Sequence, residues 1–124
     1  MKTYQDIGLL ILRVYAGSLM AFSHGFPKLS KLFSGDFGFA NPLGIGEVPS
    51  LILTVFAEFF CAVLVVIGFR SRLATIPLMI TMFVAAFIVH TDDPFSKKEF
   101  GLLYFFAYLM IFLMGPGKFA IDKK

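Results

Sequence analysis

Four long apolar stretches, separated by polar segments rich in glycine and proline, account for most of this chain. We predict helices over about 4–26, 50–69, 73–90 and 99–114. A helix needs about 20 apolar residues to cross the hydrocarbon core of a bilayer. Four such helices, joined by short loops, use almost all of the 124 residues. The sequence therefore predicts an all-α integral membrane bundle of four transmembrane helices, formed by a single domain over residues 1–124.

The scarcity of charged residues indicates that lipid, not water, solvates most of the surface. Hydrophobic residues make up 58% of the chain and charged residues 15%, against about 25% charged residues in soluble domains. The net charge of +3 is scattered, which argues against nucleic-acid binding and favours acidic phospholipid head groups as partners of the basic residues. Cys61 is the only cysteine, so an internal disulfide and a two-cysteine redox centre are excluded.

Proline and glycine mark the expected helix ends. Pro27 is expected to end the first helix, so that 27–49 forms the longest loop and lies against the membrane surface. Gly115-Pro116-Gly117 is expected to stop the last helix.

The distribution of basic residues predicts how the bundle is oriented. Four spans place both termini and the turn around 70–72 on one side of the membrane. That side carries six lysines and arginines, and the other side carries four: Lys2, Arg70, Arg72, Lys118, Lys123 and Lys124 against Lys28, Lys31, Lys97 and Lys98. The positive-inside rule then favours cytoplasmic termini in a bacterial-type cytoplasmic (inner) membrane.

Two ionisable residues interrupt the apolar stretches. Arg13 lies well inside the first predicted helix and Glu58 well inside the second, and each costs roughly 2.5–3.5 kcal/mol if it faces lipid. With the expected helix ends, the two residues are offset along the membrane normal by only about 4 Å. We therefore predict an Arg13–Glu58 ion pair in the bundle interior, serving either a chemical role or helix register alone.

Helical periodicity extends this polar interior. On the first helix, His24 falls about 20° from Arg13, and on the third helix Met79, Phe83 and Ala86 share a face with His90. We expect catalytic roles for three of these side chains: Glu58, His24 and His90. We expect ligand-binding roles for four others: Arg13, Lys28, Tyr104 and Tyr108. The alternatives are packing tyrosines, interfacial histidines and a Lys28 that extends to the membrane surface.

These residues, in this order, resemble the DoxX family of small four-helix membrane proteins. The resemblance covers nearly the whole chain and is carried by several short motifs: Arg13, Gly17, His24-Gly25 and Lys28-Leu29, Ala57-Glu58, the turn Gly68-Phe69-Arg70-Ser71-Arg72-Leu73-Ala74, His90, and Gly115-Pro116-Gly117-Lys118 with Asp122. The sequence departs from the family pattern at Phe60-Cys61-Ala62, where glycine tends to follow the glutamate, and at Ala120, where serine is common. The resemblance implies a subunit of an oxidoreductase system, and one branch is similar to a thiosulfate:quinone oxidoreductase subunit.

Three functions remain open from the sequence. The first is a redox subunit that binds a quinone in the polar interior and works with a partner oxidoreductase subunit, with Glu58 or a histidine as proton acceptor. The second is a haem protein with His24 and His90 as axial ligands. The third is a non-enzymatic membrane anchor, assembly factor or small-molecule carrier. Homo-oligomerisation is compatible with each of them, and no metal site is expected.

Overall fold

The computed structural model describes residues 2–35, 44–89 and 94–122, which form four helical rods and no strand. The first rod joins α1 (Lys2–Leu19), the π-helical turn η1 (Met20–Gly25) and α2 (Phe26–Phe33). The second joins α3 (Glu47–Val55), η2 (Phe56–Cys61) and α4 (Ala62–Ile67). The third joins α5 (Ser71–Val84) and η3 (Ala85–Val89), and the fourth is α6 (Phe95–Met114).

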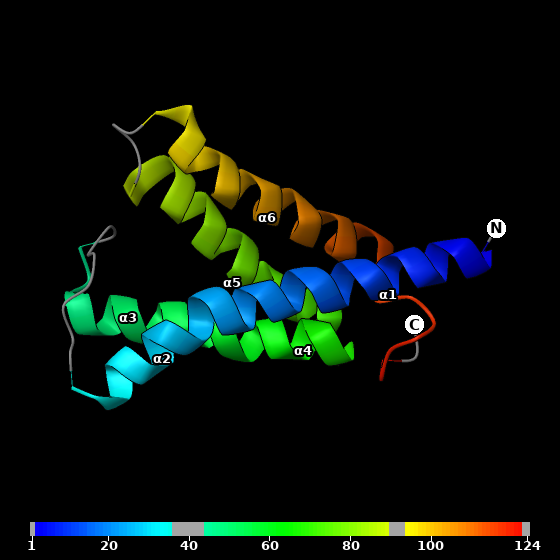
Figure 1. The fold of residues 1–124 in the computed structure, drawn as a ribbon, viewed down its shortest axis with the longest axis horizontal. Helices are drawn as coiled ribbons and strands as arrows, with labels where there is room; N and C mark the ends of the chain where they lie inside the picture. Colours follow the sequence, from blue (N-terminus) through cyan, green and yellow to red (C-terminus); the bar gives the residue numbers. More distant parts are fainter. Residues whose placement is uncertain (1, 36–43, 90–93, 123–124) are drawn as a thin grey trace.

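The rods alternate in direction, so that the start of α1 and the segment after α6 lie at the same end of the bundle (Figure 1). Three rods are long and apolar enough to cross a membrane: Thr3–Phe33, Glu47–Ile67 and Ser71–Ile88. The fourth rod, α6, packs beside α5, and its first turns carry Lys97, Lys98 and Glu99, which shorten its apolar part. The described chain is thus the all-helical bundle that the sequence predicts.

Large apolar side chains cover the outside of this bundle. Ile11 is 62% exposed, Phe22 67% and Phe106 57%. In water such a surface would be an aggregation hazard. In a bilayer it is the surface that meets the acyl chains, because lipid solvates apolar side chains without cost.

The first helix does not end at Pro27, contrary to the sequence prediction. The helix continues through α2 to Phe33, and Pro27 occupies the first turn of α2. Just before it, in η1, the backbone widens, and the Phe26 amide donates to the Ala21 carbonyl. Proline lacks an amide hydrogen and costs least where the regular α-helical ladder is already interrupted. Residues 27–33 and 47–49 of the predicted loop are therefore helix, and 36–43 lie outside the described residues.

Close contacts between backbones hold the first two rods together. A Cβ atom on Gly17 would lie 2.9 Å from the Ala62 carbonyl oxygen, and one on Gly25 would lie 2.5 Å from that of Glu58. Small residues allow such approaches between helices in membranes, where van der Waals contact replaces the hydrophobic effect as the source of association. The core between the rods includes these fully buried side chains: Met20, Leu51, Val65, Leu78, Tyr108 and Ile111.

The inward face of the third rod agrees with the prediction at Ala86 and Met79 but not at Phe83. Ala86 is 1% exposed and Met79 packs against the core, whereas Phe83 is 50% exposed and Met82, at 6%, is buried instead. The prediction counted back from His90 at a constant angle per residue. The π-helical turn η3 holds more residues than an α-helical turn, so a constant angle does not hold across it.

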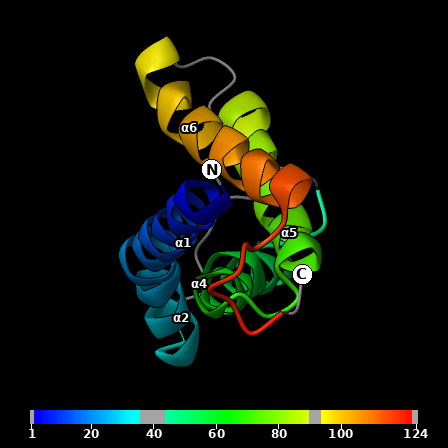
Figure 2. The same cartoon turned by 90° about the vertical axis from the view of Figure 1, so that its right-hand side faces the viewer.

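The segment after α6 folds back across the end of the bundle, beside α4 and the start of α5 (Figure 2). The Ile121 amide donates to the Ile67 carbonyl over 3.2 Å, and the Asp122 amide to that of Gly68 over 2.8 Å. The Asp122 carboxylate in turn accepts the amides of Arg70 and Ser71, at 2.8 and 3.0 Å. The carboxylate thereby satisfies two amides at the start of α5, as an N-cap side chain does.

Candidate functional site

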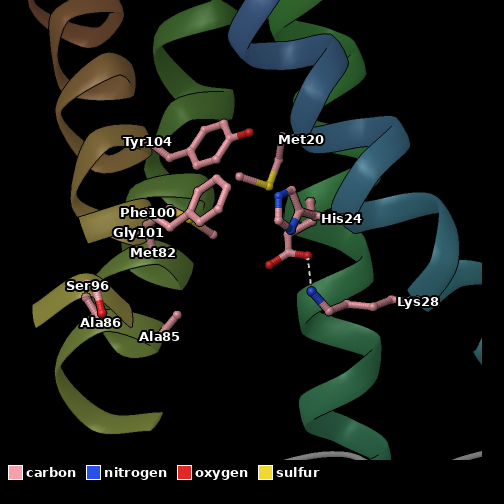
Figure 3. Close-up of a pocket in the computed structure, with 11 residues that line it drawn as sticks. Met20, His24, Lys28, Met82, Ala85, Ala86, Ser96, Phe100, Gly101 and Tyr104 are labelled. Atoms are coloured by element: carbon pink, nitrogen blue, oxygen red, sulfur yellow. Dashed lines mark hydrogen bonds and ion pairs between the residues drawn. The ribbon is translucent and has the colours of Figure 1, made fainter. Parts of the chain in front are cut away.

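A pocket of about 330 Å³ lies at the end of the bundle away from the α1 start and the segment after α6 (Figures 1 and 3). All four rods contribute to its wall. The lining residues are Met20, His24, Lys28, Glu58, Met82, Ala85, Ala86, Ser96, Phe100, Gly101 and Tyr104. Pockets of this size, mostly apolar with a few polar groups, are typical of small-molecule sites.

Each of the three π-helical turns contributes to this pocket. His24 belongs to η1, Glu58 to η2, and Ala85 with Ala86 to η3. π-helical turns are rare and costly, and they occur frequently at functional sites because they redirect side chains within a helix. Because all three irregular turns lie at the same cavity, this cavity is the candidate functional site.

The most polar feature of the pocket is an ion pair between Lys28 and Glu58. The Lys28 Nζ atom lies 2.6 Å from the Glu58 Oε1 atom (dashed line in Figure 3). The Glu58 side chain is only 5% exposed, and that of Lys28 is 27% exposed. A buried carboxylate without a partner would be strongly unfavourable, and a contacting ammonium group offsets much of that cost. The more exposed Lys28 side chain thus provides the contact partner of the nearly buried Glu58 carboxylate.

Gly25 positions this ion pair. Because Gly25 has no side chain, η1 lies directly against the backbone of Glu58 and Phe59 in η2. His24 precedes this contact, and Lys28 follows it by about one helical turn. The His24-Gly25 pair in the sequence therefore has a physical role, in which the glycine brings both neighbouring polar side chains to Glu58.

Aromatic rings form the opposite wall. The His24 ring meets Phe100 and Tyr104 edge to face, with ring centroids 5.9 and 5.6 Å apart. Phe100 and Tyr104 are stacked on each other at 6.0 Å, with ring planes 5° apart. Gly101 lets α6 approach α5, since a Cβ atom there would lie 3.2 Å from the Met82 carbonyl oxygen. Figure 3 shows the His24 ring beside Phe100 and Tyr104, with Lys28 further away and its amino group directed at the carboxylate that it contacts.

The predicted Arg13–Glu58 ion pair is wrong. The NH1 atom of Arg13 donates to the carbonyls of Val65 and Val66, at 3.2 and 3.0 Å, and the NH2 atom donates to that of Phe119. The prediction aligned the two helices by their expected ends, but the first rod extends beyond Pro27. In the structure Gly25 is level with Glu58, so Arg13 lies about 18 Å away along the helix.

Among the other predicted residues, Tyr108 lies away from the pocket. Tyr108 is fully buried, and its hydroxyl donates to the Ala16 carbonyl over 3.0 Å, inside the core rather than in the pocket. His90 lies outside the described residues, so its role and the two-histidine haem hypothesis stay predictions. His24, Lys28, Glu58 and Tyr104 are the predicted residues that the structure brings together.

The sequence reasoning missed part of the lining. Ser96 and Phe100 precede Tyr104 at intervals of four residues, so helical periodicity could have found both of them. Ala85 lies in the π-helical turn η3, where counting by α-helical periodicity fails, and Met82 lies in α5 shortly before that turn. The place of Gly101 in the lining could not be predicted without knowing where α5 packs against α6.

The pocket has the side chains for proton exchange with a polar ligand. Lys28, His24, Ser96 and Tyr104 offer N–H or O–H donors, and Glu58 offers an acceptor that can also take up a proton. Met20, Met82 and Phe100 provide soft apolar walls. A flat ring with polar edges fits this arrangement better than a fully polar solute.

A comparison with known families agrees with these features. A DoxX family model matches residues 8–91, about two thirds of the chain. The matched region includes His24, Lys28 and Glu58, whereas the α6 side of the pocket lies beyond it. No curated protein and no solved structure matches the chain. The length of the match, on a bundle of apolar helices, shows that this chain is a member of the DoxX family of membrane proteins.

Proposed function

We propose that this protein is the quinone-binding membrane subunit of an oxidoreductase system, with the pocket around Lys28 and Glu58 as its site. The observation that carries the proposal is the buried ion pair beside a cavity walled by rings and thioethers. Such a site is polar at one point and apolar around it, which matches the head group of a quinone.

The polar groups are suited to the two oxidation states of such a head group. A quinone carbonyl accepts hydrogen bonds, which Lys28, His24 or Tyr104 can donate. A quinol hydroxyl donates one, which Glu58 can accept. The ring itself would lie among Phe100 and the methionines, with one polar edge directed at the ion pair.

The chemistry assigned to this chain is proton transfer. Oxidation of a quinol to a quinone releases two protons and two electrons. In this proposal Glu58 accepts a proton from the bound quinol, with Lys28 compensating the change in charge, and His24 is a second acceptor. The two electrons pass to a partner oxidoreductase subunit, and reduction of the quinone runs the same steps in reverse.

The orientation of the site follows from the charge distribution. The end with the α1 start and the segment after α6 carries the larger number of basic residues in the sequence. We propose that this end faces the cytoplasm of a bacterial-type cell. The pocket then lies in the opposite half of the membrane and exchanges protons towards the outer side.

Binding tests the first part of the proposal. We expect the protein in lipid nanodiscs to bind a decyl-substituted dimethoxybenzoquinone saturably in calorimetric titrations. Lys28→Met should weaken binding about tenfold, the loss of one charge-assisted hydrogen bond. Lys31→Met on the same helix is the matched control and should leave binding unchanged. Absence of saturable binding, or equal affinity in both variants, would refute the site.

Turnover tests the second part. We expect the protein to accelerate oxidation of the corresponding quinol by ferricyanide, and Glu58→Gln to reduce that acceleration at least about tenfold, as loss of a general base does. Glu47→Gln changes an exposed carboxylate on the same rod and serves as control. Tight quinone binding without any acceleration would overturn the catalytic part and leave a carrier or anchor.

A further inference from the structure

A second cavity, of about 260 Å³, lies between α1 and α6. It is lined by Tyr15, Ala16 and Leu19 from α1 and by Phe100, Leu103 and Tyr104 from α6. Apart from two tyrosine hydroxyls, these side chains offer no polar group. We call this cavity the α1–α6 groove.

The α1–α6 groove adjoins the polar pocket. Phe100 and Tyr104 line both cavities, so the stacked pair of rings stands between them. On one side of this pair lie His24, Lys28 and Glu58, and on the other side the lining is apolar. The two neighbouring cavities together offer a polar end and an apolar end.

The apolar end opens towards lipid. α6 diverges from the first rod towards the pocket end of the bundle (Figure 1). Leu103 and Tyr15, which line the groove, are 65% and 67% exposed on the outer surface of the helices. A molecule in the groove would therefore contact the protein on one side and acyl chains on the other.

We propose that the α1–α6 groove holds the apolar tail of the quinone whose head group occupies the polar pocket, and that it is the route by which this ligand enters from the bilayer. The inference rests on the proposed function, and it adds that the ligand is a long-tailed quinone dissolved in the membrane rather than a small quinone from water. An apolar tail that leaves sideways between α1 and α6 stays in apolar surroundings throughout. A tail that left at the bundle end would pass the Lys28–Glu58 ion pair.

The test compares two ligands in four proteins in nanodiscs. The ligands are the dimethoxybenzoquinone ring without a tail and the same ring with a decyl tail. Leu103→Trp fills the groove from its rim, and Ala16→Met fills it from its floor in case the first variant disturbs folding. Leu113→Trp is the matched control, because Leu113 is 63% exposed on the same helix and lines neither cavity.

We expect Leu103→Trp and Ala16→Met to weaken binding of the tailed ring about tenfold and to leave the tail-less ring unchanged. Leu113→Trp should change neither. Partitioning of the tailed ligand into lipid is the same for all four proteins and cancels in the comparison.

Each contrary result has its own meaning. Equal losses for both ligands, or none, would show that the groove does not hold the tail, while the quinone site itself would stand. Failure of both ligands to bind the unaltered protein would refute the proposed function and the tail site together.

Discussion

The two ends of this bundle each hold a basic side chain between the helices, but its surroundings and partners differ. At the pocket end, Lys28 contacts the Glu58 carboxylate and its side chain is 27% exposed beside a cavity. At the other end, Arg13 is fully buried and donates only to backbone carbonyls, those of Val65, Val66 and Phe119. The first arrangement leaves room for a ligand and a group that can change protonation, whereas the second fixes chain segments to each other.

The choice of residue agrees with this division. The planar guanidinium group of arginine has five donors in fixed directions and stays charged, so it can hold several carbonyls at once. Gly68 makes the arrangement possible, since a Cβ atom there would meet Ala120 and the NH1 atom of Arg13. Lysine has a flexible stem and a single ammonium group, which a ligand can approach. We infer that the Arg13 end is structural and the Lys28 end is functional, and three substitutions test this contrast.

The largest effect is expected at Arg13. Arg13→Met removes three charge-assisted hydrogen bonds and releases the segment around Phe119, which should lower the free energy of unfolding in detergent by about 4 kcal/mol. Arg72→Met is the matched control, because the exposed Arg72 side chain donates one hydrogen bond, to the Phe112 carbonyl over 2.9 Å. It should cost about 1 kcal/mol. If Arg13→Met abolished quinone binding at temperatures where the protein stays folded, the two ends would not be independent.

A smaller effect is expected at Gly25. Gly25→Ala places a methyl group 2.5 Å from the Glu58 carbonyl oxygen, so η1 and η2 must separate. We expect a loss of about 2 kcal/mol in unfolding free energy, typical of overpacking, together with weaker quinone binding. Gly8→Ala on the same rod meets no atom within 4 Å and should cost no stability. Full quinone affinity in Gly25→Ala would mean that the contact does not position the site.

The smallest effect is expected at Asp122. Hydrogen bonds from the Arg70 and Ser71 amides hold the pKa of the Asp122 carboxyl below its usual value, and the nearby Arg70 and Arg13 charges act in the same direction. A lowered pKa in the folded state means that the carboxylate stabilises the fold above the unfolded pKa of about 3.9 and loses this effect as the pH falls through the folded value.

Asp122→Asn should therefore lower the unfolding free energy by about 1 kcal/mol at neutral pH, as loss of a helix cap does. The difference from the unaltered protein should shrink in denaturant titrations as the pH falls below about 4 and disappear below the lowered pKa of the folded state. Quinone binding should not change at any pH in this series. A difference that persisted at acidic pH would show that the carboxylate charge is not what Asp122 contributes.

Much of the fold was determined by the sequence alone. The apolar stretches predicted the helices and their membrane setting, because apolar runs of this length have no stable place on a surface in water. The same reasoning found His24, Glu58 and Tyr104, because a polar residue inside an apolar helix costs too much to lack a role or a partner. Lys28 was predicted from its place next to the His24 end of the first helix.

The tertiary structure alone decided which of these residues meet. Arg13 and Glu58 were paired in the prediction because a constant rise and angle per residue were assumed up to Pro27. Helix continuation beyond Pro27 and the π-helical turns change both quantities, and neither leaves a signal in the apolar pattern. Register between helices is set by where backbones can approach, as at Gly25 and Glu58, and that depends on both helices together. The sequence therefore determined the membrane bundle and its polar residues. Packing between helices determined that Lys28 contacts Glu58 at a pocket, and that Arg13 instead binds backbone carbonyls at the opposite end.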